Sequence, residues 1–144
     1  MPREQFRLSH PIRVRWAEVD PQSVVFNANY LVYFDVGATE YWRAIGLVYP
    51  EGFTKHGIDL FAVKATIDYH SPARYDDEID VLARVAKLGR TSLRVAIEIH
   101  RGADHLVSGE LVYVVTDLET RKPMPIPDVL RGAITGYERV APES

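Results

Sequence analysis

Hydrophobic and polar residues alternate along several stretches of this chain, which is the pattern of a strand with one buried face. The first such stretch places an apolar side chain at every second position, at Ile12, Val14 and Trp16. If the alternation continues, Glu18 and Asp20 lie on the same side of the strand as these apolar residues. We therefore predict a strand whose buried face ends in two carboxylates, followed by a turn at Pro21 and Ser23.

Residues 30–45 have a different pattern, since most of them are apolar or aromatic. The polar residues in this stretch are few: Asp35, Thr39, Glu40 and Arg43. Three of them are four positions apart and form one narrow stripe on a helix, and a helix that is apolar over most of its circumference belongs inside a fold. We predict such a helix, capped at its start by Asn27 or Asn29 and ended by Gly46.

Four later stretches alternate in the same way and are predicted as strands: residues 61–69, 79–85, 93–99 and 111–115. Short breaks at residues 89–91 and 101–104 separate the last three, and these lengths are typical of antiparallel hairpins. A short helix is expected from Asp128 to Tyr137. One antiparallel sheet wrapped around one long central helix buries every apolar face. We therefore predict an α+β protein with the hotdog fold, as a single domain over residues 1–144.

The composition excludes several classes of function. A chain of 144 residues with 47% hydrophobic and 26% charged residues is typical of a globular domain. The formal net charge of −3 and the lack of a basic run argue against nucleic-acid binding. The sequence has no cysteine, which excludes disulfides, thiolate catalysis and thiolate-bound metals. No apolar run approaches the roughly 20 residues of a membrane span, and the polar N-terminal stretch does not look like a secretory signal, so we expect a cytoplasmic protein.

The segment Asp20–Tyr30 resembles a motif of a known enzyme family. It reads Asp-Pro-x-x-Val-Val-Phe-x-Ala-Asn-Tyr, which is similar to the motif of the 4-hydroxybenzoyl-CoA thioesterase family of hotdog acyl-CoA thioesterases. Two later segments support the resemblance and follow the family's order: Tyr69-x-x-Pro72-Ala73 continuing into Tyr75-Asp76-Asp77, and Leu88-Gly89-Arg90-x-Ser92. The resemblance covers residues 12–127, which is nearly the whole chain.

The resemblance implies hydrolysis of an acyl-CoA thioester without a cofactor. Asp20 stands at the family's catalytic aspartate position, and Asn27 stands where the family uses a backbone N–H to polarise the thioester carbonyl. Active sites of the family lie between subunits, which implies a homodimer or a homotetramer. Two positions depart from the family pattern: Ser23 replaces a usual glycine, and Asn27 replaces a histidine or tyrosine of many relatives. If the turn needs a positive φ, serine adds a modest strain there.

Thioester hydrolysis needs a base or nucleophile, together with stabilisation of the developing oxyanion. Asp20 can attack the carbonyl and form an anhydride, or it can activate a water as general base, and the sequence leaves both routes open. The N–H groups of a helix N-terminus supply the oxyanion stabilisation. An aspartate before a proline is also a common turn residue with no catalytic role. For Glu18, a salt bridge to an arginine is expected in preference to a role beside Asp20.

The candidate substrate-binding residues are Phe26, Tyr30 and Arg90. Phe26 and Tyr30 are close to the proposed catalytic residues in sequence and are expected to border an acyl pocket. Arg90 lies in a predicted hairpin that matches the family, and we expect it to contact the phosphates of CoA; Lys87 and Arg74 are weaker candidates because charged residues are usually only solvated. A small aromatic or a short-chain acyl group fits the pattern, and delivery by CoA or by a carrier protein stays open.

The five histidines are scattered along the chain with no metal-binding spacing: His10, His56, His70, His100 and His105. We therefore predict solvated or hydrogen-bonded histidines and no metal site. A hotdog hydratase or dehydratase is a second enzyme hypothesis, but it needs a histidine at the helix start, where this chain has asparagines. A third hypothesis is a non-catalytic module that binds acyl-CoA or an acyl carrier, which only Ser23 favours.

Overall fold

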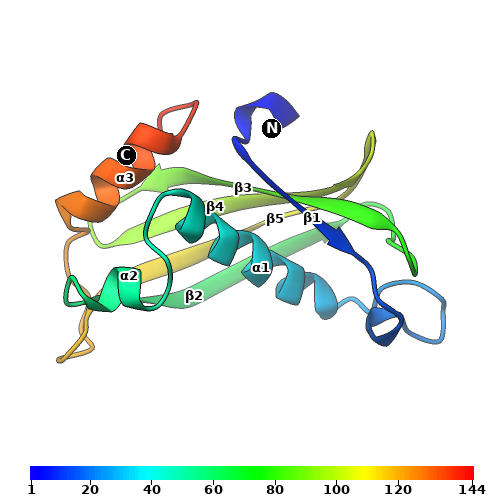
Figure 1. Cartoon of the computed structure of the whole chain (residues 1–144), viewed down its shortest axis with the longest axis horizontal. Helices are drawn as coiled ribbons and strands as arrows, with labels where there is room; N and C mark the ends of the chain where they lie inside the picture. Colours follow the sequence, from blue (N-terminus) through cyan, green and yellow to red (C-terminus); the bar gives the residue numbers. More distant parts are fainter.

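A five-stranded antiparallel sheet forms the body of the protein, which the computed structural model describes over residues 1–144 (Figure 1). Its strands follow the spatial order β1-β3-β4-β5-β2. Their bounds are Leu8–Arg13 for β1, Ile58–Tyr69 for β2, Glu78–Leu88 for β3, Ser92–Arg101 for β4 and Asp104–Asp117 for β5. The predicted strands of the second half, and the two tight hairpins that join β3, β4 and β5, are thus confirmed.

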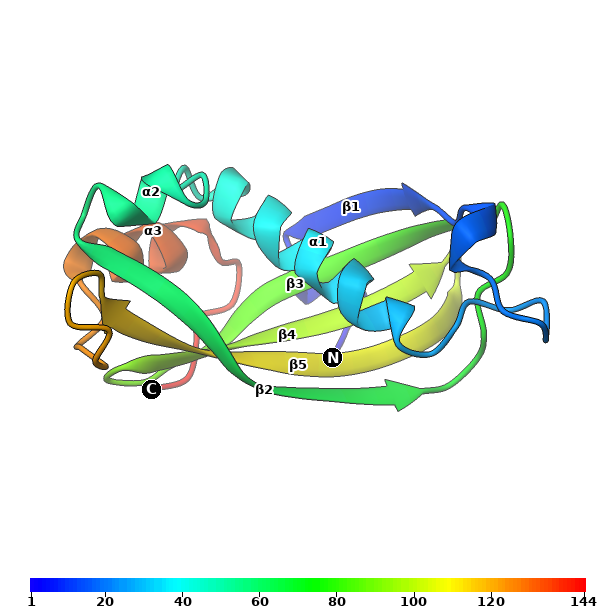
Figure 2. The ribbon, with the colours of Figure 1, turned by 90° about the horizontal axis from the view of Figure 1, so that it is seen from below.

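The long helix α1 (Asn29–Ala44) lies across the concave face of this sheet (Figure 2). Its buried side chains include five that form the centre of the core: Tyr33, Phe34, Ala38, Tyr41 and Trp42. The helix approaches the sheet closely at Gly37, where a Cβ atom would lie only 2.6 Å from Cγ1 of Val81 on β3. The predicted hotdog architecture, a sheet wrapped around a central helix, is confirmed by this arrangement.

Two shorter helices cover the end of the sheet where α1 ends. Helix α2 (Glu51–Thr54) has only four residues, and the sequence pattern did not predict it. Helix α3 occupies Asp128–Tyr137, the range expected from the sequence, and buries Leu130 and Ile134. No helix of the chain is both long enough and apolar enough to cross a bilayer.

The prediction of a strand running through to Asp20 is wrong. Strand β1 ends at Arg13, and residues Trp16–Glu18 form a short 3-10 helix that leaves the Trp16 side chain 74% exposed. The cause is local: the Glu18 carboxylate accepts a hydrogen bond from the Arg15 backbone N–H and pairs with the Arg15 guanidinium. These bonds close a tight turn. The expected salt bridge of Glu18 to an arginine is confirmed.

The two ends of α1 differ in how well the sequence predicted them. The helix begins after Ala28, and neither Asn27 nor Asn29 caps it with a side chain. The Asn29 amide instead donates a hydrogen bond to the Glu18 carbonyl, 3.0 Å away, which ties the helix start to the preceding loop. At the other end the prediction is confirmed, since Gly46 follows the last turn with a φ of +86°, a conformation that glycine adopts without strain.

The edge strand β2 is unusually exposed for a strand of 12 residues. It pairs with β5 on one side only, and its other edge has no partner in the chain. The pairing register shifts between Ala62 and Lys64, so Val63 forms a bulge whose side chain is 60% exposed. Phe61 and Tyr69 on the same strand are also exposed. A long apolar edge of this kind is a typical surface for pairing with another chain.

Candidate active site

The loop that carries Asp20 folds back on itself as a small hairpin. Val19 and Val25 form an antiparallel bridge, and the Asp20 N–H donates to the Val24 carbonyl at 2.9 Å. The Phe26 N–H donates to the Glu18 carbonyl at 3.0 Å. Figure 1 shows this loop reaching past the end of the sheet, beside the start of α1. Asp20 is therefore held on an ordered loop and not inside the core.

The tip of this hairpin has the conformation that the family glycine would favour. Ser23 has a φ of +64°, which lies in the left-handed region and costs a non-glycine residue some strain. Oδ1 of Asp20 accepts a hydrogen bond from the Gln22 N–H at 2.8 Å. The second carboxylate oxygen, Oδ2, has no hydrogen-bond partner in the chain, so it is the oxygen available for chemistry.

Two backbone donors at the start of α1 are free. The N–H groups of Asn27 and Ala28 make no hydrogen bond within the chain, whereas the next N–H, that of Asn29, donates to the Phe26 carbonyl. The first N–H groups of a helix lie at the positive end of its dipole and bind anions readily. This pair can therefore stabilise an oxygen atom on which negative charge develops.

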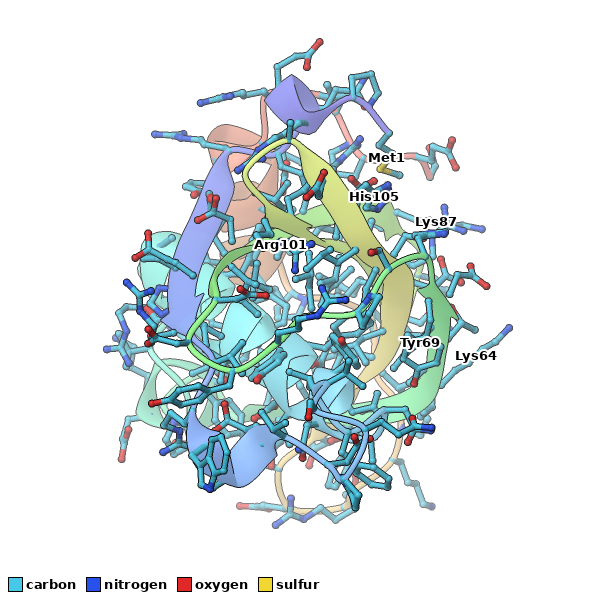
Figure 3. All side chains as sticks on the ribbon, turned by 90° about the vertical axis from the view of Figure 1, so that its right-hand side faces the viewer. Met1, Lys64, Tyr69, Lys87, Arg101 and His105 are labelled. Carbon is cyan, nitrogen blue, oxygen red and sulfur yellow. The ribbon has the colours of Figure 1, made fainter.

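A pocket of about 210 Å³ opens at this helix end. Its lining comes from the loop before α1, from α1 and from the segment after β2: Val25, Asn27, Tyr30, Tyr69, His70, Ser71 and Pro72. The Tyr69 hydroxyl donates to the Asn27 carbonyl at 3.1 Å. This bond holds the peptide group that links Asn27 to Ala28 and carries the free Ala28 N–H. Figure 3 shows Tyr69 at the edge of the sheet, where its side chain is exposed.

The floor of the pocket is built on Tyr30. Its side chain is buried, its hydroxyl accepts a hydrogen bond from the Ala73 N–H at 3.0 Å, and its ring meets the Tyr69 ring edge-on at 5.5 Å. Burial raises the pKa of Tyr30, so its hydroxyl stays protonated at neutral pH. Tyr30 therefore acts as a wall and an anchor for the loop, not as a base.

Arg101 holds the segment that follows β2 in place. Its guanidinium donates to the Pro72 carbonyl at 3.2 Å and to the Asp77 carboxylate at 2.8 Å. Burial acts to raise the pKa of Asp77, but hydrogen bonds from the Arg74 N–H and from Arg101 outweigh it and keep that pKa below its usual value. Because Pro72 lines the pocket, its bond to Arg101, which Figure 3 labels, fixes one wall.

Glu18 connects helix α1 to the loop that precedes it. Its carboxylate accepts a hydrogen bond from the Tyr33 hydroxyl at 2.9 Å. Burial acts to raise the pKa of Glu18, but the bonds from the Arg15 backbone, from Tyr33 and from the Arg15 side chain together lower it. Glu18 is thus an ionised group with all its bonds directed to the scaffold, which agrees with the structural role expected from the sequence.

The structure brings together only part of the predicted site. Asn27 and Tyr30 line the same pocket, while Asp20 and Phe26 lie on the adjoining loop and do not line it. Arg90 lies in the turn between β3 and β4, at the opposite end of the sheet, so one chain alone does not bring it to the pocket. Residues 69–72 complete the pocket, and no role was predicted for them; their only signal was the family-like Tyr69-x-x-Pro72-Ala73 segment.

The comparisons with known proteins agree with this geometry. Residues 14–134 match the model of the thioesterase-like superfamily. The acyl-CoA thioester hydrolase YbgC of Escherichia coli O157:H7 is 25% identical over 118 residues, covering 81% of this chain and 87% of that protein. The residues matched by the family model include the Asp20 loop, α1 and the whole pocket.

Two solved structures share the fold over nearly the whole chain. The PA5185 protein of Pseudomonas aeruginosa strain PAO1 has a TM-score of 0.83 and 26% identity, covering 96% of both chains. A thioesterase of Thermus thermophilus, solved with coenzyme A and Zn, has a TM-score of 0.81 and 28% identity, covering 94% of this chain and 96% of that chain.

Proposed function

The chain belongs to the thioesterase-like superfamily, and on that premise we propose that it hydrolyses a small aromatic or short-chain acyl-CoA to the free acid and CoA. The names of its relatives support this class of reaction, since YbgC is an acyl-CoA thioester hydrolase. The Thermus thermophilus thioesterase was solved with coenzyme A, which supports CoA as the carrier of the acyl group. The pocket is smaller than the roughly 300–1,000 Å³ of drug-sized ligand sites, which favours a small acyl group.

The observation that carries this proposal is the pair of free N–H groups on Asn27 and Ala28 beside the pocket. A thioester carbonyl placed there receives hydrogen bonds that strengthen as its oxygen becomes negative in the tetrahedral intermediate. The bond between the carbonyl carbon and sulfur then breaks, and CoA leaves as the thiolate. Removal of one such donor typically slows a reaction of this type about a hundred- to thousandfold.

Asp20 supplies the second requirement of the chemistry. Its free Oδ2 either attacks the thioester carbon, giving an acyl-Asp20 anhydride that water then cleaves, or removes a proton from the attacking water. In both routes one water is consumed and one acid and one thiol are released. Since Asp20 does not line the pocket of its own chain, the loop must adjust on substrate binding or a second subunit must complete the site.

A second copy of the chain can supply residues that one chain alone does not bring to the pocket. In a two-fold pairing of β2 with its copy, the strands run antiparallel, so the Ile58 end of one β2 lies beside the Tyr69 end of the other. The turn that carries Arg90 is at the same end of the sheet as Ile58. Pairing therefore carries the Arg90 of one subunit toward the pocket of the other, where it can bind CoA phosphates.

The test is release of free thiol from a panel of aromatic, short-chain and long-chain acyl-CoAs by the wild type, by Asp20→Asn and by Asp128→Asn. We expect turnover of small acyl groups by the wild type and by Asp128→Asn, a matched substitution on helix α3 that changes neither the Asp20 loop nor the residues lining the pocket. Asp20→Asn should lose at least about a hundredfold in kcat, because an amide is neither nucleophile nor base.

Full activity of Asp20→Asn would exclude Asp20 as the catalytic residue. Binding of acyl-CoA without thiol release by the wild type would instead favour the non-catalytic module, a hypothesis that the strained Ser23 turn supports.

A further inference from the structure

The face of the sheet turned away from α1 carries a compact group of imidazole and carboxylate side chains. Glu98 and His100 are two residues apart on β4, so they project from the same face. The register pairs Glu98 with Leu82 of β3, and Leu82 packs under Phe6 on this outer face. On the neighbouring strand β5, His105 lies opposite His100.

The ligand atoms of these three residues lie close to one another. Nε2 of His100 is 2.9 Å and Nε2 of His105 is 3.8 Å from the same oxygen, Oε1 of Glu98, and all three residues offer ligand atoms within 4.8 Å of one another. In a tetrahedral zinc site with bonds of about 2.0–2.1 Å, two ligand atoms lie about 3.3 Å apart. The two measured separations lie on either side of that value. We propose that Glu98, His100 and His105 form a binding site for a transition-metal ion of the zinc type.

Burial of two of the ligands supports a built site and not a chance surface cluster. The side chains of Glu98 and His100 are only 7% and 10% exposed, although both are polar. The rings of His100 and His105 stack in parallel with their centroids 4.6 Å apart, which holds the two imidazoles side by side. Binding exchanges two existing bonds for the metal: that of His100 to Glu98 and that of His105 Nε2 to the Val107 carbonyl, 3.1 Å away.

The donor set selects the class of metal. Two imidazoles and one carboxylate suit zinc and its neighbours cobalt and nickel, whereas magnesium and calcium prefer sites made of oxygen atoms. Three protein ligands leave a fourth position open. Glu98 also lines a surface hollow of about 400 Å³ together with Met1 and Ser108, so the proposed site lies beside solvent.

Apart from these two exchangeable bonds, the contacts of neighbouring residues do not occupy the proposed ligand atoms. The Met1 ammonium pairs with Oε2 of Glu98 at 3.3 Å, and this leaves Oε1 for the metal. Figure 3 shows Met1 and His105 close together on this side of the molecule. The ring of His70 lies 4.7 Å from that of His105, but its Nε2 is bonded to Ser108 at 2.8 Å. A bound ion would link strand β4 to strand β5 and so stabilise this hairpin.

The five histidines are scattered in the sequence, so their spacing did not predict this cluster. Only the register of β4 against β5 brings His100 and His105 together. The sequence spacing of Glu98, His100 and His105 matches no common metal motif, and the hairpin turn between the two histidines makes the meeting possible. The proposal is independent of thioester hydrolysis, and its test does not use activity.

The experiment measures zinc bound to the full-length protein after removal of metals with a chelator, by calorimetric titration and elemental analysis. We expect one zinc ion per chain in the wild type and no binding of magnesium. His105→Ala and Glu98→Gln should each weaken zinc binding at least about tenfold. His56→Ala, which removes an exposed histidine far from the cluster in sequence, is the matched control and should bind zinc like the wild type.

A second readout separates loss of binding from loss of folding. Zinc should raise the unfolding temperature of the wild type and of His56→Ala, because a ligand that binds the folded state stabilises it. It should not raise that of His105→Ala, a variant whose partly exposed side chain can be removed without opening the core. The proposal is overturned if the wild type binds no zinc, or if His105→Ala binds it with unchanged affinity and the histidine–glutamate group is only an ion pair.

Discussion

At the scale of single residues, the loop before α1 combines free donors with a strained tip. Asn27 and Ala28 leave their N–H groups unused, while Glu18 and Tyr69 each fix the backbone around them by hydrogen bonds. An active site needs polar groups that are held in place yet not consumed by the fold. The helix start of this chain meets both conditions.

Ser23 makes the strain at this loop testable. Its φ of +64° costs a residue with a Cβ atom more than it costs glycine. We expect Ser23→Gly to stabilise the protein by about 1 kcal/mol, which raises the unfolding temperature by about 4 °C in a chain of this size. Thermal unfolding followed by circular dichroism measures the shift. An unchanged or lower unfolding temperature would mean that the serine turn is not strained.

At the scale of elements, one buried carboxylate after helix α3 bonds to both helix α1 and strand β3. Glu138, which follows α3, accepts hydrogen bonds from the Tyr41 hydroxyl of α1 and from the Val85 N–H of β3. Its other oxygen, Oε1, is buried without a partner. Burial raises the pKa of Glu138 above its ordinary value of 4.5 despite these bonds.

The raised pKa predicts a specific dependence of stability on pH. Because the folded state holds the Glu138 proton more tightly than the unfolded state, the contribution of this group is fully present below pH 4.5 and is lost as the pH rises through the raised pKa. We expect Glu138→Gln to gain stability relative to the wild type across this window, since glutamine keeps the acceptor oxygen and is never charged. Urea unfolding of both proteins between about pH 4 and pH 8, the range in which such groups titrate, checks this. If the free energies of unfolding of the two proteins change with pH in parallel, the prediction is contradicted.

The sequence predicted α1, α3, β2, β3 and β4 close to their observed bounds, whereas β5 (Asp104–Asp117) was predicted only over residues 111–115. Periodicity failed after Arg13, because one side chain, Glu18, bonds to the Arg15 backbone and turns the chain. The pocket was predicted in part. Asn27 and Tyr30 are neighbours in sequence, whereas the segment after Tyr69 reaches them only through the packing of the sheet against α1. Such long-range pairing leaves no trace in a local pattern of polar and apolar residues.

At the scale of the whole molecule, the exposed edge of β2 predicts an oligomer. We expect the wild type to be a dimer, and Val63→Glu to be a monomer, because a charge on the exposed bulge opposes burial against a second copy. Val129→Glu, at an exposed valine of α3, is the matched control and should remain a dimer. Analytical ultracentrifugation gives the masses. A dimeric Val63→Glu protein would show that another surface joins the subunits.

The expected dimer also bears on the position of Arg90. One chain holds the pocket and the Arg90 turn at opposite ends of the sheet, and the proposed antiparallel pairing of β2 would bring them together. Thiol release should therefore fall together with dimer content in Val63→Glu. The CoA-binding role of Arg90 depends on this geometry and would be excluded by full activity in a monomer.

The measurement that most directly tests thioester hydrolysis at the start of α1 compares kcat for thiol release in Asn27→Ala and Asn27→Pro. Alanine keeps the backbone N–H and should leave kcat within about threefold of the wild type, whereas proline removes that donor and should lower kcat about a hundred- to thousandfold. Circular dichroism verifies that both variants fold. Equal rates in a folded Asn27→Pro protein and in the wild type would contradict the account, because the Asn27 N–H would then play no part in the reaction.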